Sequence, residues 1–223
     1  MQTATREAQV TGTLVEAIRN TENLYEGDLV YYFQKVFYNA QNLRYPYHNF
    51  RHMFHVLWLC YEACKYYQDE LTRRRMRILL LGAMFHDFDH SGMFGNDDLN
   101  IERARRGLKK FILPEDEGDF DEIVELIGGT EYPPKITESL SLSGAILCDA
   151  DLAQALNPAW IQQVIFGLSA EWGKTPFDLL AMQEKFMGSL NFRTQWAQEK
   201  FPQSVIDAKI REAQELHALL VVM

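Results

Sequence analysis

The chain has 223 residues, of which 47% are hydrophobic and 24% are charged. That balance is typical of a folded globular protein and excludes a mainly disordered, collagen-like or low-complexity chain. The net charge of −9 (22 basic against 31 acidic residues) disfavours binding to a nucleic-acid polymer, whose phosphates an acidic surface repels. No run of about 18 apolar residues occurs, so we expect no contact with a membrane. The first residues lack the basic-then-apolar pattern of a signal peptide, which predicts a cytoplasmic location.

Apolar residues recur at helical spacing along nearly the whole chain, and no stretch alternates as a half-buried strand does. One all-α domain spanning residues 1–223 is therefore predicted. The apolar C-terminus, residues 219–223, is suited to docking against the core or against another subunit of a homo-oligomer. We expect helices near residues 14–18, 29–37, 48–67, 71–85, 99–113, 119–127, 139–156, 159–172, 177–190 and 203–220.

Five of the six histidines fall between positions 48 and 90. His48 and His52 are four residues apart, so the helix predicted there places them on one face. His86 and Asp87 follow the most apolar helix of the chain. Ionisable groups at the end of a buried helix are costly unless a metal ion or a partner compensates them. The cluster therefore indicates a metal site rather than ordinary core packing.

A further acidic pair, Asp149 and Asp151, ends the apolar stretch 142–148. Together with His52, His86 and Asp87, one of these two aspartates would complete a set of two nitrogen and two oxygen donors. Such a set suits a borderline or hard divalent ion that keeps open positions for water. The residue types alone do not decide between Asp149 and Asp151.

Three short motifs carry a family resemblance. Residues 47–52 read Tyr-His-Asn-Phe-Arg-His, residues 86–92 read His-Asp-Phe-Asp-His-Ser-Gly, and residues 150–152 read Ala-Asp-Leu. This pattern resembles the HD-domain metal-dependent phosphohydrolases, and most closely a compact form of the catalytic domain of class I cyclic-nucleotide phosphodiesterases. The resemblance extends over about residues 45–196 and implies the all-α fold of that family.

The resemblance also implies roles for individual residues. His48 would be the general acid, and His90 would orient a water on a second metal ion. Two divalent ions (Zn, Mg, Mn or Fe) are implied, with Asp87 bridging them. The first ion would be held by His52, His86, Asp87 and Asp151. The nucleotide would be bound by Tyr47, Gln183 and Phe186. The side chains that contact and support these ligands would be Asn49, Glu102 and Thr130. Gln198 and Phe201 have the same spacing as Gln183 and Phe186 and remain an alternative for the base-binding pair.

The implied activity is hydrolysis of a cyclic nucleotide phosphodiester to a 5′-nucleotide by a metal-activated hydroxide, so the partner is a small-molecule phosphoester. Two alternatives stay open: an HD phosphohydrolase that acts on a nucleotide monoester or triphosphate, and a non-catalytic, metal-stabilised nucleotide-binding module. Guanosine-tetraphosphate hydrolases are disfavoured because no glutamate-aspartate pair follows His86 and Asp87. Di-iron oxygenases are disfavoured because His90 is the only histidine between that pair and Asp151.

Overall fold

The computed structural model describes residues 13–95, 97–132 and 140–221. Within these ranges every regular element is helical and no strand occurs, so the all-α prediction is confirmed. None of the described helices is long and apolar enough to span a membrane. The α-helices are α1 (Leu14–Arg19), α2 (Val30–Asn39), α3 (Phe50–Tyr66), α4 (Arg73–Phe85), α5 (Asp97–Phe111), α6 (Phe120–Gly128), α7 (Leu142–Leu152), α8 (Gly167–Trp172), α9 (Pro176–Gly188), α10 (Gln195–Lys200) and α11 (Gln203–Val221).

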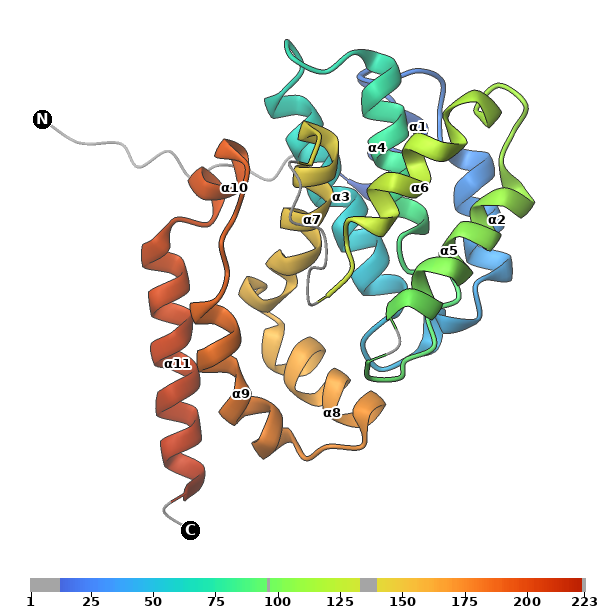
Figure 1. Cartoon of the computed structure of the whole chain (residues 1–223). Coiled ribbons are helices and arrows are strands. Elements are labelled where there is room, and N and C mark those ends of the chain that lie inside the picture. The colour runs from blue at the N-terminus through green and yellow to red at the C-terminus, as the bar shows by residue number, and fades with distance from the viewer. Residues whose placement is uncertain (1–12, 96, 133–139, 222–223) are drawn as a thin grey trace, which may run out of the picture.

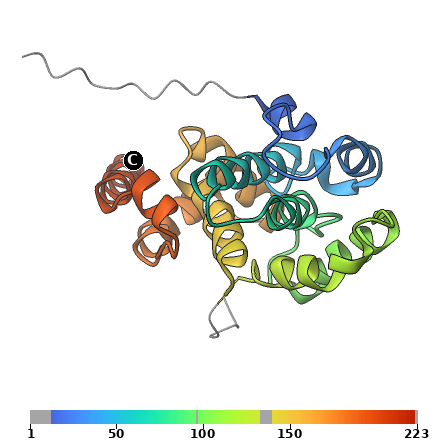
Figure 2. The same ribbon diagram turned by 90° about the horizontal axis from the view of Figure 1, so that it is seen from above.

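Helices α3, α4 and α7 pack against one another in the middle of the molecule (Figures 1 and 2). Helix α4 is apolar on all sides, and its residues from Met76 to Phe85 are buried. A helix that is apolar all round is stable only when other elements cover it completely. Helix α4 is covered by α2, α3, α5, α6 and α7. Its C-terminal end therefore lies inside the molecule.

Helix α3 begins later than the sequence pattern predicts. Asn49 is its N-cap, and the Asn49 side chain accepts hydrogen bonds from the backbone N–H groups of Arg51 and His52. An asparagine cap satisfies backbone donors that have no partner inside the helix, so it sets the first turn. His48 consequently lies before the helix, and the expectation that His48 and His52 share a helical face is wrong.

The second half of the chain differs from the prediction in three further places. Helix α7 starts at Leu142, and the predicted start at residue 139 lies outside the described residues. A π-helical segment, Ile161–Phe166, precedes α8 where one continuous helix is predicted. Helix α10 is not predicted at all, because six residues are too few to show a helical period.

Helices α9 and α11 lie side by side at one edge of the molecule, on the side away from α5 (Figures 1 and 2). Helix α11 therefore supports α9, which carries two of the predicted nucleotide-binding residues. Near the end of α11 the side chains of Leu219 and Leu220 are exposed rather than docked on the core. The last two residues, 222–223, lie outside the described part.

Candidate active site

Four ionisable side chains converge where the ends of three segments meet. His52 comes from the first turn of α3, His86 and Asp87 directly follow α4, and Asp151 lies in the last turn of α7. The Nε2 atom of His52 is 3.2 Å from Oδ2 of Asp87 and 3.1 Å from Oδ1 of Asp151. The Nε2 atom of His86 is 3.4 Å from that of His52, 3.5 Å from Asp87 Oδ2 and 3.9 Å from Asp151 Oδ1. We call these four residues the HHDD cluster.

These separations match those between ligand atoms around a single bound ion. Nitrogen and oxygen ligands lie about 2.0–2.2 Å from a zinc ion, so neighbouring ligand atoms around it are about 3.0–3.6 Å apart. All but one of the separations above fall in that range, and the 3.9 Å pair is only slightly wider. Two imidazole nitrogens 3.4 Å apart require either a proton on one of them, which the other accepts, or a cation that accepts both lone pairs.

The protonation pattern of the HHDD cluster fits a divalent ion. The Nδ1 atom of His86 donates to the backbone carbonyl of Ala83 at 2.8 Å, which leaves the Nε2 lone pair aimed into the cluster. The buried Oδ2 atom of Asp87 has no hydrogen-bond partner among the described residues. Its nearest polar atoms are the Nε2 atoms of His52 and His86 at 3.2 and 3.5 Å, so either a proton on one of these nitrogens or a cation would compensate the buried carboxylate.

The two carboxylates of the cluster need a positive charge to balance them. Burial lowers the pKa of His52, but the carboxylates of Asp151 and Asp87 outweigh it and raise that pKa to about 10. Burial raises the pKa of Asp87, whereas the neighbouring imidazoles, that of His86 foremost, bring it well below its usual range. Without a metal, a proton held on His52 balances the carboxylates. A divalent ion can replace that proton and bind all four donors.

Asp149, the rival of Asp151, points away from the cluster. Its buried carboxylate accepts hydrogen bonds from the backbone N–H groups of Arg193 and Thr194 and from the Thr194 hydroxyl, at 2.8 to 3.0 Å. It thereby fixes the loop that leads into α10. Asp149 is a structural carboxylate, and of the two aspartates only Asp151 is close to His52.

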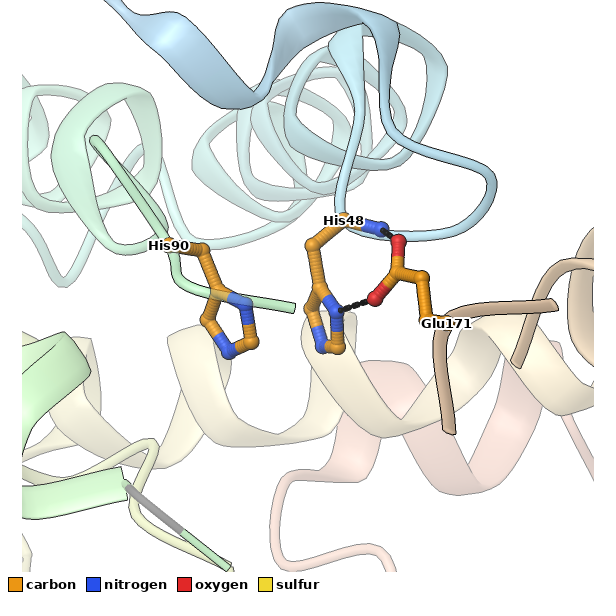
Figure 3. A group of neighbouring side chains, drawn as sticks. All are labelled: His48, His90 and Glu171. Atoms are coloured by element: carbon orange, nitrogen blue, oxygen red, sulfur yellow. Dashed lines mark hydrogen bonds and ion pairs between the residues drawn. The ribbon is translucent and has the colours of Figure 1, made fainter. Parts of the chain in front are cut away.

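His48 is held beside the cluster by Glu171 of α8 (Figure 3). Its Nδ1 atom is 2.7 Å from Oε2 of Glu171, and because a carboxylate only accepts, Nδ1 is the donor. The other oxygen, Oε1, accepts from the backbone N–H groups of His48 and Tyr47 at 2.8 and 2.6 Å. Burial raises the pKa of Glu171, but the contact with His48 lowers it below its usual range, so Glu171 stays ionised. Glu171 thus fixes the tautomer of His48 and leaves Nε2 for other chemistry.

His90 stacks face to face on His48, with ring centroids 3.5 Å apart (Figure 3). Its Nδ1 atom accepts from the backbone N–H of Gly92 at 2.9 Å, and its Nε2 atom is 2.8 Å from the side-chain amide of Asn100. Burial lowers the pKa of His90 to about 4, so the ring is neutral next to His48. Both nitrogens of His90 are therefore engaged by the protein, and these contacts do not support the expectation that His90 orients a water.

A cavity of about 590 Å³ opens over the HHDD cluster. That volume is within the usual range for small-molecule sites. Tyr47 lies on its wall and stacks on the His52 ring at a centroid distance of 5.0 Å. Thr130 also lines it, with its hydroxyl bound to the carbonyl of Ile127. The cavity and the cluster thus form one site.

Gln183 and Phe186, on α9, both line this cavity. The amide nitrogen of Gln183 donates to the Leu179 carbonyl at 3.1 Å. Its Oε1 atom is buried and accepts no hydrogen bond from the described part of the chain. The alternative pair does not line the cavity, since Gln198 bonds to the Phe192 carbonyl and Phe201 packs on the Phe192 ring.

A family model described as 3′5′-cyclic nucleotide phosphodiesterase matches residues 47–103. The resemblance to this family is confirmed. The matched segment holds His48, His52, His86, Asp87 and His90. The other contributors to the site lie beyond it: Asp151, Glu171, Gln183 and Phe186. The comparison with curated proteins finds no match.

The resemblance to the phosphodiesterases predicts that Glu102 and Asn49 support the ligands, but their positions in the structure differ from that expectation. Glu102 is on the outer face of α5, where it pairs with Arg105 and Arg106, and the structure does not bring it to the site. Asn100, which lies half a turn earlier, faces inward and contacts His90 instead. Asn49 acts through the backbone, as the cap that sets the first turn of α3 and so the position of His52.

Sequence reasoning missed two acidic residues of the site. Glu171 lies far from the histidine motifs in the chain, and only its apolar helical context and the following Trp172 could have drawn attention to it. Asp97 begins α5, lines the cavity, and accepts from the backbone N–H of Tyr132 at 2.7 Å. Burial raises the pKa of Asp97, and nearby Asp87 and Asp151 raise it further.

Proposed function

We propose that this chain is a metal-dependent phosphodiesterase that hydrolyses a cyclic nucleotide to a 5′-nucleotide. The observation that carries the proposal is the HHDD cluster at the base of a cavity that also holds His48 and Gln183. The partial match to the cyclic-nucleotide phosphodiesterase family supports it independently. A separate indication is the charge of the cavity wall, where Asp87, Asp97 and Asp151 would repel a phosphate unless cations were bound.

His52, His86, Asp87 and Asp151 would hold the first divalent ion, and Asp87 would also contribute to a second one. Bound divalent ions lower the pKa of water to about 7 and neutralise charge on phosphoryl oxygens. The protein contributes the fixed geometry: α3, α4 and α7 are buried helices, so their ends keep the four donor atoms in place without a ligand. Such pre-arrangement lowers the entropic cost of assembling the site.

His48 is the proposed general acid. Glu171 orients its ring through Nδ1, so the protonated ring can donate from Nε2 to the oxygen that leaves phosphorus. The Glu171 carboxylate also stabilises the positive charge that His48 carries before the transfer. We assign His90 the task of holding the His48 ring from its other face, because the two rings stack.

Gln183 and Phe186 are the proposed contacts to the base. The unpaired Oε1 of Gln183 can accept a hydrogen bond from an N–H or amino group of a purine edge. The half-buried ring of Phe186 offers a face for stacking. Tyr47 would close the cavity beside His52.

We also propose that residues 1–223 form one domain around this site. The support is a single hydrophobic core to which residues from α1, such as Ala17, and from α11, such as Ala213, both contribute.

The proposal is tested by incubating the purified protein with 3′,5′-cyclic AMP or cyclic GMP in the presence of Mn²⁺, Mg²⁺ or Zn²⁺. Phosphorus NMR should show the cyclic diester converted to the 5′-monophosphate, and a chelator should stop the conversion. Cleavage of nucleotide monoesters or triphosphates alone would favour the other phosphohydrolase activity. Nucleotide binding without any turnover would identify a binding module instead.

A further inference from the structure

The cavity over the HHDD cluster has two aromatic walls, and the proposed cyclic-nucleotide activity uses one of them. The first consists of Phe186 and Tyr132, whose ring centroids are 5.9 Å apart at an interplanar angle of 68°. The second consists of Phe94 and Trp172, 4.8 Å apart at 65°. All four rings line the same cavity.

The second wall is exposed at Phe94, whereas Trp172 is half-buried and packs against the hydrophobic core. Phe94 is 65% exposed although it is a large apolar residue, and its neighbour Met93 is 62% exposed. They lie between Gly92 and Gly95, whose φ angles of +70° and +79° favour glycine. Because Met93 and Phe94 also line the cavity, their side chains are available to contact a bound ligand.

The position of the second wall relates it to the leaving group. Trp172 directly follows Glu171, the residue that holds His48. His48 is the proposed donor to the leaving oxygen, and we place the leaving part of the substrate on the side of the cavity that Trp172 lines. Phe186 and Gln183 come from a different helix, α9, and contact the part of the substrate that keeps the phosphate.

A cyclic mononucleotide has a single base and can stack on only one of these walls. The cavity volume of about 590 Å³ leaves room for a larger molecule. A phosphodiester that joins two nucleosides has one base on each side of the phosphorus, which matches two aromatic walls beside one metal site. Every base has a face that can stack on an aromatic ring, so this fit does not depend on base identity.

Building on the proposed phosphodiesterase function, we propose that the substrate class of this site includes linear dinucleotides, with the 3′-linked nucleoside on Phe94 and Trp172 and the 5′-linked nucleoside on Phe186 and Tyr132. In the reaction a water oxygen forms a bond to phosphorus and the bond from phosphorus to O3′ breaks. The electron pair leaves with O3′, which takes the proton of His48, and the proton that the attacking water loses restores the protonated form of His48. The products are a nucleoside with a free 3′-hydroxyl and a nucleoside 5′-phosphate.

The test compares the dinucleotide ApA with 3′,5′-cyclic AMP in the metal-loaded protein and in three variants. Phe94→Ala should lower kcat/KM for ApA by about tenfold or more, since it removes one stacking surface, and should change that for cyclic AMP by less than about twofold. Phe186→Ala should lower kcat/KM for both ApA and cyclic AMP. Tyr38→Ala removes an aromatic ring that is 80% exposed and does not line the cavity, and it should alter neither.

The results separate this inference from the activity on which it rests. If cyclic AMP is cleaved and ApA is not, or if Phe94→Ala lowers both substrates equally, the dinucleotide inference is wrong and the phosphodiesterase stands. If neither substrate is cleaved, the proposed function fails. In that case the dinucleotide inference is tested separately, by calorimetric measurement of ApA binding. Weaker binding of ApA to Phe94→Ala than to the wild-type protein would support two base subsites. If ApA does not bind to the wild-type protein, the inference is wrong.

Discussion

Replacing Asp87 by asparagine is expected to abolish tight metal binding. Asp87 Oδ2 lies 3.2 and 3.5 Å from the Nε2 atoms of His52 and His86, at the centre of the HHDD cluster. The change removes a charged donor, so the affinity should fall by more than the 10- to 100-fold that loss of an outer hydrogen-bond partner typically costs. Elemental analysis and titration of metal into stripped protein measure the effect. Full metal content in this variant would contradict the assignment of the cluster.

Asp149→Asn is the matched control. It neutralises another buried aspartate, two residues from Asp151, whose contacts are with residues 193 and 194. Metal content should therefore be unchanged. The free energy of unfolding should fall by about 1–3 kcal/mol, because an asparagine Nδ2 atom cannot accept the hydrogen bonds that Oδ2 takes from the Thr194 N–H and hydroxyl. Denaturant titration measures this loss, and a loss of metal without a loss of stability would mean that Asp149 is a ligand.

Replacing His48 by alanine is expected to lower kcat by about 100- to 10,000-fold while the metal remains bound. The reason is that His48 contacts Glu171 through Nδ1 and is not among the four donors of the cluster. Glu171→Gln should lower kcat by a smaller factor with KM and metal content kept, because an amide oxygen can still accept from the two backbone N–H groups but cannot balance the charge of His48. Steady-state kinetics and metal analysis of both variants provide the measurement.

His52→Ala distinguishes the two kinds of histidine. It should lose metal and turnover together, since His52 is a donor of the cluster. If His48→Ala and His52→Ala lose metal equally, His48 is a ligand and another residue supplies the proton.

The grouping of His52, His86 and Asp87 could be predicted from the sequence because its signal is local. His86 and Asp87 follow an apolar run, and ionisable residues at the end of a buried helix need a partner. His52, His86 and Asp87 meet for that reason. The choice of Asp151 over Asp149 came from the family pattern alone, and the three-dimensional reason is the loop at Thr194 that occupies Asp149.

The remaining features depend on contacts between distant segments. Glu171 reaches His48 across 123 positions of sequence, and helical periodicity contains no information on that pairing. The cap at Asn49 places His48 outside α3, although its spacing from His52 fits a helix. On α5, the rotation of the helix brings Asn100 rather than Glu102 to the site, and a shift of two residues is enough to exchange an inward for an outward side chain.

The central claim is that the HHDD cluster binds a divalent ion. The most direct test is an anomalous difference map from crystals of the protein grown with Mn²⁺ or Zn²⁺. We expect an ion about 2.0–2.2 Å from His52 Nε2, His86 Nε2, Asp87 Oδ2 and Asp151 Oδ1. An ion bound instead by His48, His90 and Glu171, or no ion at these residues, would contradict it.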